Sequence, residues 1–411
     1  MAELLEKIIS YAGEKGTLVQ RGEMAQREIY YDLVSVDDHL TEPPDLFVGR
    51  VPSQYADRAP RVERDDKGVD FWVFEEERIP ILGSDSMCGW ESGHGYLGPV
   101  NFDELHPAVY NIHQRVRHMD VIGLRSSLTF PSAPFGFAGT RFLKFQDADL
   151  ALASLRAFND WILEEWAGPY PGRIIPCQLP WLRDPQQAAD EIRINAARGF
   201  TSVSFSENPE KLGLSSLHSG EWDPFFAACV ETGTIINLHV GSSSETLVPS
   251  KQSPPAVLGA LFPVNAMASA ADWLFSGIPV RFPDLKIVLS EGGIGWVGML
   301  IDRIEYMARD LDYSKDFGSL SPVDVLRRNF YFTTFCDPST LPLRHLVGTD
   351  HIMVETDYPH IDSSWPDSQD MLHQQFAGID AAEIEQMTHR NAEQLYRLPA
   401  VATVGRTSAS I

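Results

Sequence analysis

Residues 33–39, LVSVDDH, decide the fold, because an apolar run leads directly into two aspartates and a histidine. The same arrangement returns three times along the chain, at 235–239 (IINLH), 286–291 (KIVLSE) and 352–357 (IMVETD). Short apolar runs that alternate with helical patterns are typical of parallel strands buried on both faces. These four segments therefore indicate buried parallel strands whose carboxyl ends carry polar side chains.

Further apolar runs, separated by segments with helical periodicity, bring the number of expected strands to eight. The strands are expected at residues 33–36, 124–130, 174–179, 201–205, 235–240, 286–290, 330–335 and 352–356. The main helices are expected at 104–120, 147–166, 185–198, 222–232, 263–277, 295–310 and 381–397. Eight such strands suggest closure into a barrel, so we predict an α/β fold, a (β/α)₈ TIM barrel.

Composition outside the regular part predicts how the chain is organised. We expect a helical N-terminal extension (1–30), a barrel domain (31–398), a long insertion after strand one that covers the barrel mouth (43–115), and a disordered tail (399–411). The insertion is rich in proline, glycine and aromatic residues, and we expect one hairpin in it, between 71–74 and 79–82.

The charge balance narrows the choice of partners. The 411 residues contain 33 lysines and arginines against 57 acidic residues, which gives a formal net charge of −24. A surface of that sign repels phosphate backbones and anionic membranes, so we expect neither as a partner. No apolar leader is visible near residue 1, and a cytoplasmic enzyme acting on a small molecule is the expectation, with a homodimer as one option.

Cysteines and most histidines are interpreted as structural. The four cysteines lie far apart without a CxxC pair, which favours buried thiols over disulfides or a thiolate zinc site (Cys88, Cys177, Cys229 and Cys336). Four histidines lie outside the strand ends and are given the same interpretation (His94, His106, His113 and His118).

Polar residues at the strand ends are the candidate site, because the carboxyl ends of barrel strands form the functional face. Taken singly, a histidine after a strand is usually a hydrogen-bonded core residue, and an acid there commonly caps the next helix. Four such ends together favour a metal ion, which would give several buried charged groups a common partner. The expected ligands are Asp37, His39, Glu42, His239, Glu291, Asp357 and His360, with Glu291 and His360 also expected in catalysis.

The size of this set predicts the metal. It exceeds the three protein ligands usual for a catalytic zinc and is enough for two ions. Carboxylate-rich coordination suits iron or manganese better than zinc.

Four motifs carry a resemblance to a known family. Residues 36–39 (VDDH), 238–241 (LHVG), 355–360 (ETDYPH) and 388–392 (THRNA) resemble the amidohydrolase-related TIM barrels that include aminocarboxymuconate semialdehyde decarboxylase. The resemblance runs from about residue 36 to 397 and implies that His39, His239 and Asp357 bind metal.

Two positions depart from that pattern. Thr41, followed by Glu42, stands where the family has a second strand-one histidine, and Glu291 stands where it has a histidine before Gly-Gly. With these changes the chain looks like the branch of TIM-barrel non-haem diiron monooxygenases, whose members are suspected of acting on large acyl substrates such as coenzyme A thioesters or terpenoid acids.

The first expectation is therefore a diiron monooxygenase that hydroxylates a bulky apolar acid or acyl-CoA-type thioester. It implies two iron ions, with mixed iron and manganese or zinc as alternatives, and an electron-donor reductase as partner. The alternative is a hydrolase, decarboxylase or hydratase that uses divalent metal to activate water or polarise a carbonyl. A third reading is a non-catalytic protein that keeps ligand-like residues.

The substrate is left open. Aromatic residues of the insertion either line an apolar pocket or pack within the loop (Trp72, Trp90, Tyr96, Phe102 and Tyr110). Arg125 and Arg141 either bind an acid group or form surface ion pairs.

Overall fold

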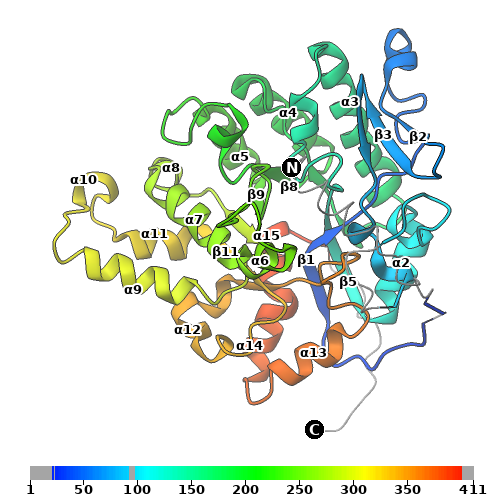
Figure 1. Cartoon of the computed structure of the whole chain (residues 1–411). Helices are drawn as coiled ribbons and strands as arrows, with labels where there is room; N and C mark the ends of the chain where they lie inside the picture. The colour runs from blue at the N-terminus through cyan, green and yellow to red at the C-terminus, as the bar shows by residue number, and fades with distance from the viewer. Residues whose placement is uncertain (1–20, 23, 92–97, 400–411) are drawn as a thin grey trace.

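A closed barrel of parallel strands lies at the centre of the molecule, with helices around it (Figure 1). The structure is a computed structural model and describes residues 21–22, 24–91 and 98–399. The barrel strands are β1 (Leu33–His39), β5 (Leu124–Phe130), β6 (Ile174–Ile175), β7 (Cys177–Gln178), β8 (Ser202–Phe205), β9 (Ile235–His239), β10 (Ile287–Ser290), β11 (Phe330–Thr334) and β12 (Ile352–Val354). β6 and β7 lie within the one strand expected at 174–179, and each of the others begins within one residue of an expected strand. The prediction of an eight-stranded TIM barrel is confirmed.

Two sheet segments and their contacts close the ring. The parallel orders are β1-β5-β6 and β7-β8-β9-β10-β11-β12. β6 and β7 are halves of one strand, separated by Pro176, which has no N–H to give to a ladder. On the other side, the Asp357 N–H donates to the Asp37 carbonyl (3.0 Å) and the His39 N–H to the Tyr358 carbonyl (2.6 Å). These bonds join the end of β12 to β1.

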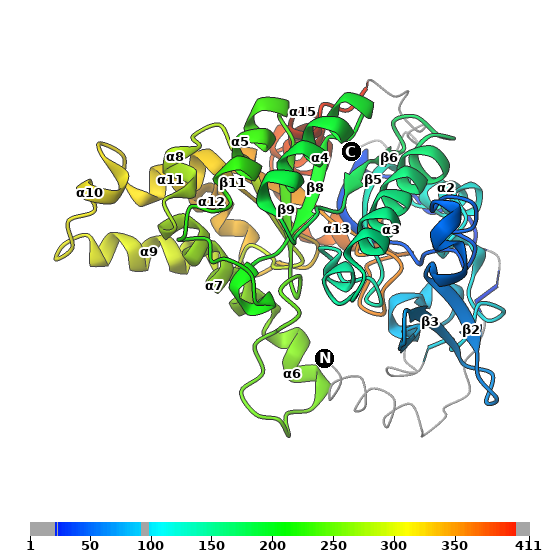
Figure 2. The ribbon, with the colours of Figure 1, turned by 90° about the horizontal axis from the view of Figure 1, so that it is seen from above.

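The helices pack outside the strands (Figure 2). They are α2 (Ile112–Val121), α3 (Ala148–Trp161), α4 (Pro185–Arg198), α5 (Asp223–Thr232), α6 (Pro255–Ala260), α7 (Phe262–Phe275), α8 (Ile278–Arg281), α9 (Val297–Met307), α10 (Ser314–Phe317), α11 (Pro322–Asn329), α12 (Arg344–Val347), α13 (Ser368–Gln375), α14 (Ala381–Glu385) and α15 (Asn391–Tyr396). Two π-helical segments are η6 (Ile162–Ala167) and η10 (Gln386–Arg390). The 3₁₀ helices are η1 (Ser53–Arg58), η2 (Gly83–Asp85), η3 (Met87–Gly89), η4 (Pro107–Val109), η5 (Thr140–Leu143), η7 (Pro209–Leu212), η8 (Leu341–Leu343) and η9 (Thr349–His351). Among the described residues, no helix combines the length and the apolar character needed to cross a bilayer.

The insertion folds into a small antiparallel sheet of β2 (Arg61–Arg64), β3 (Asp70–Phe74) and β4 (Glu77–Pro80). β3 and β4 form the expected hairpin. β2 was not expected, because its residues RVER are largely exposed and carry no apolar alternation. The helix expected after residue 104 starts only at Ile112, where the Asn111 side chain accepts the His113 and Gln114 N–H groups as an N-cap.

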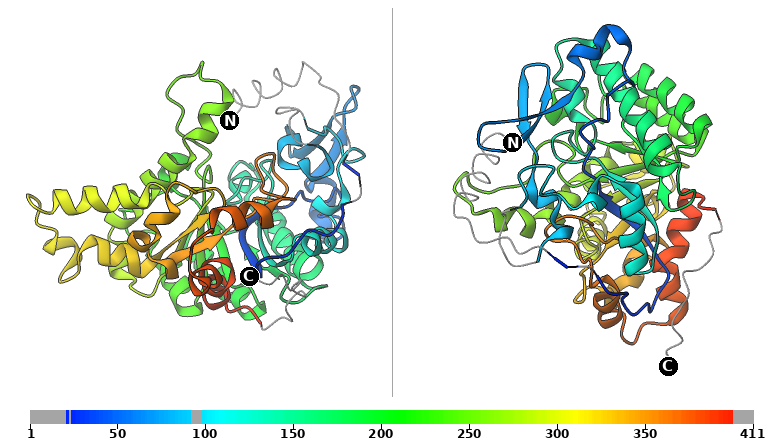
Figure 3. Two further views of the ribbon diagram at one scale, coloured as in Figure 1. Left: turned by 90° about the horizontal axis from the view of Figure 1, so that it is seen from below. Right: turned by 90° about the vertical axis from the view of Figure 1, so that its right-hand side faces the viewer.

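The chain ends are only partly described. Most of the predicted N-terminal helix lies in 1–20, and most of the predicted disordered tail in 400–411, both outside the described residues. Residues 24–30 form neither a helix nor a strand on the way to β1 (Figure 3). The Tyr30 N–H donates to the Gln369 side chain of α13.

The carboxyl-terminal helix covers the amino ends of the strands. The Asn391 side chain of α15 donates to the carbonyls of Ile352 (2.7 Å) and Thr349 (2.8 Å), at the start of β12. Tyr396 is fully buried, and its hydroxyl donates to the Asn237 side chain of β9. The opposite end of the barrel is therefore the open one, and the polar strand ends lie there.

We expect Asn391→Ala to destabilise the fold by about 1–3 kcal/mol, because two backbone carbonyls lose a buried donor. Urea unfolding measures this as a lower midpoint with an unchanged m-value. Gln394→Ala, an exposed position on the same helix, is the control and should shift stability by no more than about 0.5 kcal/mol. Equal effects of the two changes would contradict this role for Asn391.

Candidate metal centre

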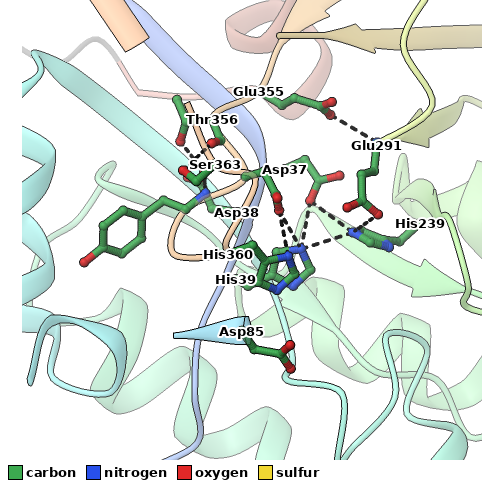
Figure 4. Close-up of polar contacts among 12 residues, drawn as sticks. Asp37, Asp38, His39, Asp85, His239, Glu291, Glu355, Thr356, His360 and Ser363 are labelled. Atoms are coloured by element: carbon green, nitrogen blue, oxygen red, sulfur yellow. Dashed lines mark hydrogen bonds and ion pairs between the residues drawn. The ribbon is translucent and has the colours of Figure 1, made fainter. Parts of the chain in front are cut away.

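Two histidines from opposite parts of the chain meet at the open end of the barrel (Figure 4). The Nε2 atoms of His39 and His239 lie 3.1 Å apart, and both side chains are fully buried. The Nδ1 of His239 lies 2.7 Å from the Val240 carbonyl, which can only accept, so Nδ1 carries the proton and Nε2 keeps its lone pair. Two nitrogens about 2 Å from one shared ion would be separated by roughly this distance.

Carboxylates surround the same point. The Oδ1 of Asp37 lies 3.5 Å from the Nε2 atoms of both histidines. Asp357 Oδ1 lies 3.3 Å from His39 Nε2, and Glu291 Oε2 lies 3.5 Å from His239 Nε2. The ends of four strands thus contribute to one buried cluster.

His360 joins this cluster from the loop after β12. Its Nδ1 lies 3.0 Å from Asp357 Oδ1, and its ring stacks on that of His39 with centroids 3.7 Å apart. Three overlapping groups have their ligand atoms within 4.8 Å of one another: Asp37, His39 and His239; His39, Asp357 and His360; Glu291, Asp357, His360 and Asp362. Six of the seven expected ligands are therefore brought together, and Asp362 is added.

Both acids that follow β10 and β12 have an unusual backbone. Glu291 has φ 62° and Asp357 has φ 52°, in the left-handed region that residues other than glycine rarely adopt. Such conformations cost about 1–3 kcal/mol and occur mainly at functional sites. At these two positions the strain turns each carboxylate toward the histidines.

The cluster contains more acidic groups than positive charges. Although burial lowers the pKa of His360, the Asp357 carboxylate raises it to about 9, so His360 is the cationic histidine of the cluster. Burial, with repulsion from Glu355, Asp357 and Glu291, raises the pKa of Asp37 well above its usual range, and burial raises the pKa of Asp357 to about 7. Burial likewise lowers the pKa of His239 to about 3, so this ring is neutral. Neither carboxylate oxygen of Asp37 has a hydrogen-bond donor among the described residues. Buried carboxylates without donors beside neutral imidazoles fit a divalent cation.

Glu42 does not join the cluster, which corrects the expectation that it is a ligand. Its carboxylate accepts the Ser132 N–H (3.0 Å) and the Ser132 hydroxyl at the end of β5. After β1, the Thr41 N–H donates to the Val109 carbonyl. This bond directs the backbone so that the Glu42 side chain points away from His39.

Three acidic groups near the centre were not selected from the sequence. Glu355 Oε2 accepts the Glu291 N–H (3.1 Å) and so holds the turn after β10. Asp85, from the insertion, is buried near His360 (Figure 4). Asp362 follows His360 by two residues in the same loop, and that spacing was the available signal for it.

Asp38 lies beside the ligands but faces away from them. Its carboxylate accepts hydrogen bonds from the Thr356 hydroxyl (2.5 Å), the Tyr358 N–H (3.1 Å), and the hydroxyls of Ser35 and Ser127. Thr356 and Tyr358 flank Asp357, so Asp38 holds the turn that presents this ligand.

We expect Asp38→Asn to weaken metal binding about 10–100-fold, the usual effect of removing a group that orients a ligand. An amide offers one acceptor oxygen where four donors now converge. Titration of the metal-free protein with Mn²⁺ measures the change, with Asp45→Asn, an exposed position, as control. Unchanged affinity in Asp38→Asn would contradict this role.

The other residues considered in the sequence take structural positions. Trp72 is buried against Phe47, Phe102 packs on Tyr110, and Tyr96 and His94 lie outside the described residues. The two arginines form ion pairs (Arg125 with Glu393, Arg141 with Glu77).

Cys88, His106 and His118 also lie close together. The two rings are tilted by 31° to each other, with centroids 4.5 Å apart. The His106 Nδ1 accepts the Ala108 N–H, and the His118 Nδ1 is hydrogen-bonded to the Tyr358 hydroxyl. Because one nitrogen of each ring already has a hydrogen-bond partner, the arrangement fits the structural interpretation.

A cavity of about 180 Å³ lies beside the metal centre. Its walls include Arg21, Cys88, Trp90, Tyr358, His360 and Trp365. Of the described aromatic residues that were proposed to line a pocket, Trp90 lies in its wall.

A model of the amidohydrolase family matches residues 129–398. The chain belongs to the amidohydrolase family. This match spans the barrel from the end of β5 onward and contains His239, Glu291 and Asp357. The amidohydrolase-related resemblance predicted from the motifs is confirmed.

Similar proteins are found both by sequence and by structure. The chain is 28% identical over 159 residues to the decarboxylase yanB of Aspergillus niger, a match that covers 36% of this chain and 42% of that protein. An amidohydrolase from Mycobacterium avium subsp. paratuberculosis has the same fold, with 23% identity, TM-score 0.70, and coverage of 89% and 99%. A dihydroxybenzoic acid decarboxylase from Polaromonas, solved with bound manganese and 2-nitroresorcinol, matches with 19% identity, TM-score 0.60, and coverage of 91% and 98%.

The expectation of a diiron monooxygenase is wrong. Two of the three relatives are decarboxylases and the third is an amidohydrolase, so the oxidoreductase assignment is wrong as well. The prediction depended on Glu42 and Glu291 as added carboxylate ligands, and the structure turns Glu42 toward Ser132 instead. The cavity also falls below the roughly 300 Å³ at which pockets for drug-sized ligands begin, which does not suit a bulky acyl thioester.

Proposed function

We propose that this protein is a metal-dependent decarboxylase of a small carboxylic acid. The observation that carries the proposal is the pair of imidazole nitrogens 3.1 Å apart, surrounded by buried carboxylates, at the open end of the barrel. The sequence left a hydrolase, a decarboxylase and a hydratase open as alternatives. The decarboxylase relatives support decarboxylation among these three.

The ion is proposed to be a single divalent metal, manganese or zinc. His39, His239, Asp37 and Asp357 would hold it, with Glu291 beside them. When bound, such an ion polarises oxygen atoms of a substrate as a Lewis acid. Manganese is favoured by the number of carboxylates, and it is the metal in the Polaromonas structure.

Loss of CO₂ leaves an electron pair on carbon, and that carbon then needs a proton. His360 is placed to supply it, because its Nδ1 is held by Asp357 while its Nε2 has no hydrogen-bond partner among the described residues. The stacked ring of His39 fixes the ring plane, and His360 also lines the cavity. In this scheme the C–C bond breaks, CO₂ leaves, and the proton from His360 forms the new C–H bond.

We expect CO₂ release to depend on the metal. Protein freed of metal, then given Mn²⁺, Zn²⁺ or no metal, is incubated with a panel of small aromatic and aliphatic acids labelled with ¹³C in the carboxyl group. Labelled CO₂ should appear with at least one acid in the metal-loaded samples and fall to background without metal. Equal release with and without metal would contradict the proposal.

A further inference from the structure

Glu207 is a buried acid outside the metal-ligand cluster, and it is only 2% exposed. It follows β8 by two residues. Its Oε2 accepts the Gly241 N–H (2.9 Å), and its Oε1 accepts the side-chain N–H of Asn265 in α7 (2.8 Å). Glu207 therefore connects the turn after β9 to helix α7.

The N–H that Glu207 binds belongs to the peptide group between Val240 and Gly241. The carbonyl of this same peptide group accepts the Nδ1–H of His239 (2.7 Å). A peptide group is planar, so its N–H and its C=O keep fixed directions relative to each other. A side chain that holds the N–H therefore also fixes the direction of the carbonyl that binds His239.

This peptide group needs such a support, because it is followed by a glycine. Gly241 has φ 84°, and glycine adopts both signs of φ at little cost, so the peptide group can rotate unless it is held. Glu207 contacts the turn a second time, since its own N–H donates to the Ser242 hydroxyl (3.0 Å). The Ser242 N–H in turn donates to the His239 carbonyl (3.0 Å).

The direction of the Val240 carbonyl matters at the metal centre. The Nε2 of His239 lies 3.1 Å from the Nε2 of His39, and it has a lone pair for a cation only when the ring proton is on Nδ1. We propose that Glu207 is a positioning residue, which acts through the 240–241 peptide group to hold His239 in the tautomer that binds metal. This inference rests on the metal site of the proposed function and does not depend on which reaction follows.

The proposed role needs an acceptor atom and not a negative charge. Burial raises the pKa of the Glu207 carboxyl to about 8, and both its neutral and its ionised form keep an oxygen that accepts the Gly241 N–H. Glutamine also has an acceptor oxygen and should replace Glu207. Methionine has a similar length but only a weakly accepting sulfur, and should not replace it.

Titration of the full-length metal-free protein with Mn²⁺ tests the role first. We expect Glu207→Met to weaken Mn²⁺ binding about 10–100-fold, the usual effect of removing a group that orients a ligand. Glu207→Gln should bind Mn²⁺ with close to wild-type affinity. Circular dichroism checks that each variant is folded, and Glu207→Ala takes the place of Glu207→Met if the latter is not.

Asn265→Ala is the matched control. It removes the other partner of the Glu207 carboxylate and leaves the contact with Gly241 in place. A purely structural link between β8 and α7 would be damaged equally by this change, whereas the proposed role predicts unchanged Mn²⁺ affinity.

The tautomer of His239 gives a second readout, which a structural role would not change. ¹⁵N spectra are recorded near neutral pH on metal-free protein labelled in its histidines, and the signals that His239→Gln lacks belong to His239. The wild type and Glu207→Gln should carry the proton on Nδ1. Glu207→Met should show a population with the proton on Nε2.

Each outcome either supports or overturns the inference. Wild-type Mn²⁺ affinity in Glu207→Met overturns it, and so does an unchanged tautomer in a variant that has lost affinity. A loss in Asn265→Ala or Glu207→Gln as large as in Glu207→Met overturns it as well. The predicted changes in Glu207→Met, together with no CO₂ release from any acid by the wild type, would instead contradict the proposed decarboxylation alone.

Discussion

His239→Ala is expected to abolish metal binding and lower kcat/KM by roughly 10³-fold or more. The reason is that Lewis-acid stabilisation is worth several kcal/mol, and each 1.36 kcal/mol is a factor of ten. His239 supplies one of the two facing nitrogens, and its tautomer is set by the Val240 carbonyl, so no neighbouring side chain can replace it. Metal content per chain and turnover of the best acid from the labelled panel measure the effect.

The barrel should remain folded in this variant, because its apolar core does not depend on the ion. His218→Ala is the matched control, since this histidine is 52% exposed and pairs with Asp272 at the surface. The control should keep its metal and its activity. A His239→Ala protein with full metal content and full turnover would show that the centre has been assigned to the wrong residues.

His360→Gln is expected to lower kcat about 10²–10⁴-fold while the metal stays bound. That range is the usual contribution of a positioned general acid, and glutamine retains a polar group but cannot deliver a proton. In D₂O the wild-type product should carry one deuterium at the carbon that lost CO₂. The variant should form that product much more slowly, with little change in KM.

The metal content of His360→Gln decides between two roles for this residue. The sequence predicted both ligation and catalysis, and the contact of its Nδ1 with Asp357 is compatible with each. Loss of metal as complete as in His239→Ala would make His360 a ligand and would contradict its role as proton donor. If His360→Gln kept both its metal and a normal kcat, His360 would be neither a metal ligand nor the proton donor.

Strand ends were predictable because local sequence carries the signal. His39, His239 and Asp357 each follow a short apolar run, and parallel strands of a barrel bring their carboxyl ends to one face. The fold and the convergence of these residues could therefore be inferred without any knowledge of the loops.

Residues a few positions beyond a strand were less predictable, because contacts distant in sequence determine where the loop goes. Glu42 follows His39 by only three residues, yet its direction depends on Val109 and Ser132. The monooxygenase prediction counted Glu42 as a ligand from its position after strand one and from the resemblance, and the structure contradicts this part of it.

The cavity beside the metal centre shows the same limit more strongly. Arg21 precedes β1, Trp90 belongs to the insertion, and Trp365 lies in the loop after β12. No periodicity or motif connects these three positions, and only the folded chain places them around one volume.

The central claim, decarboxylation rather than oxygenation, is tested most directly by a stoichiometry under strict exclusion of O₂. Manganese-loaded protein is supplied with the carboxyl-labelled acid that it turns over best, and labelled CO₂ and remaining acid are measured together. The account predicts one CO₂ for each acid consumed, with one new C–H bond in the product, at the same rate as in air. A reaction that stops without O₂, or a product that retains its carboxyl group and gains oxygen, would contradict it.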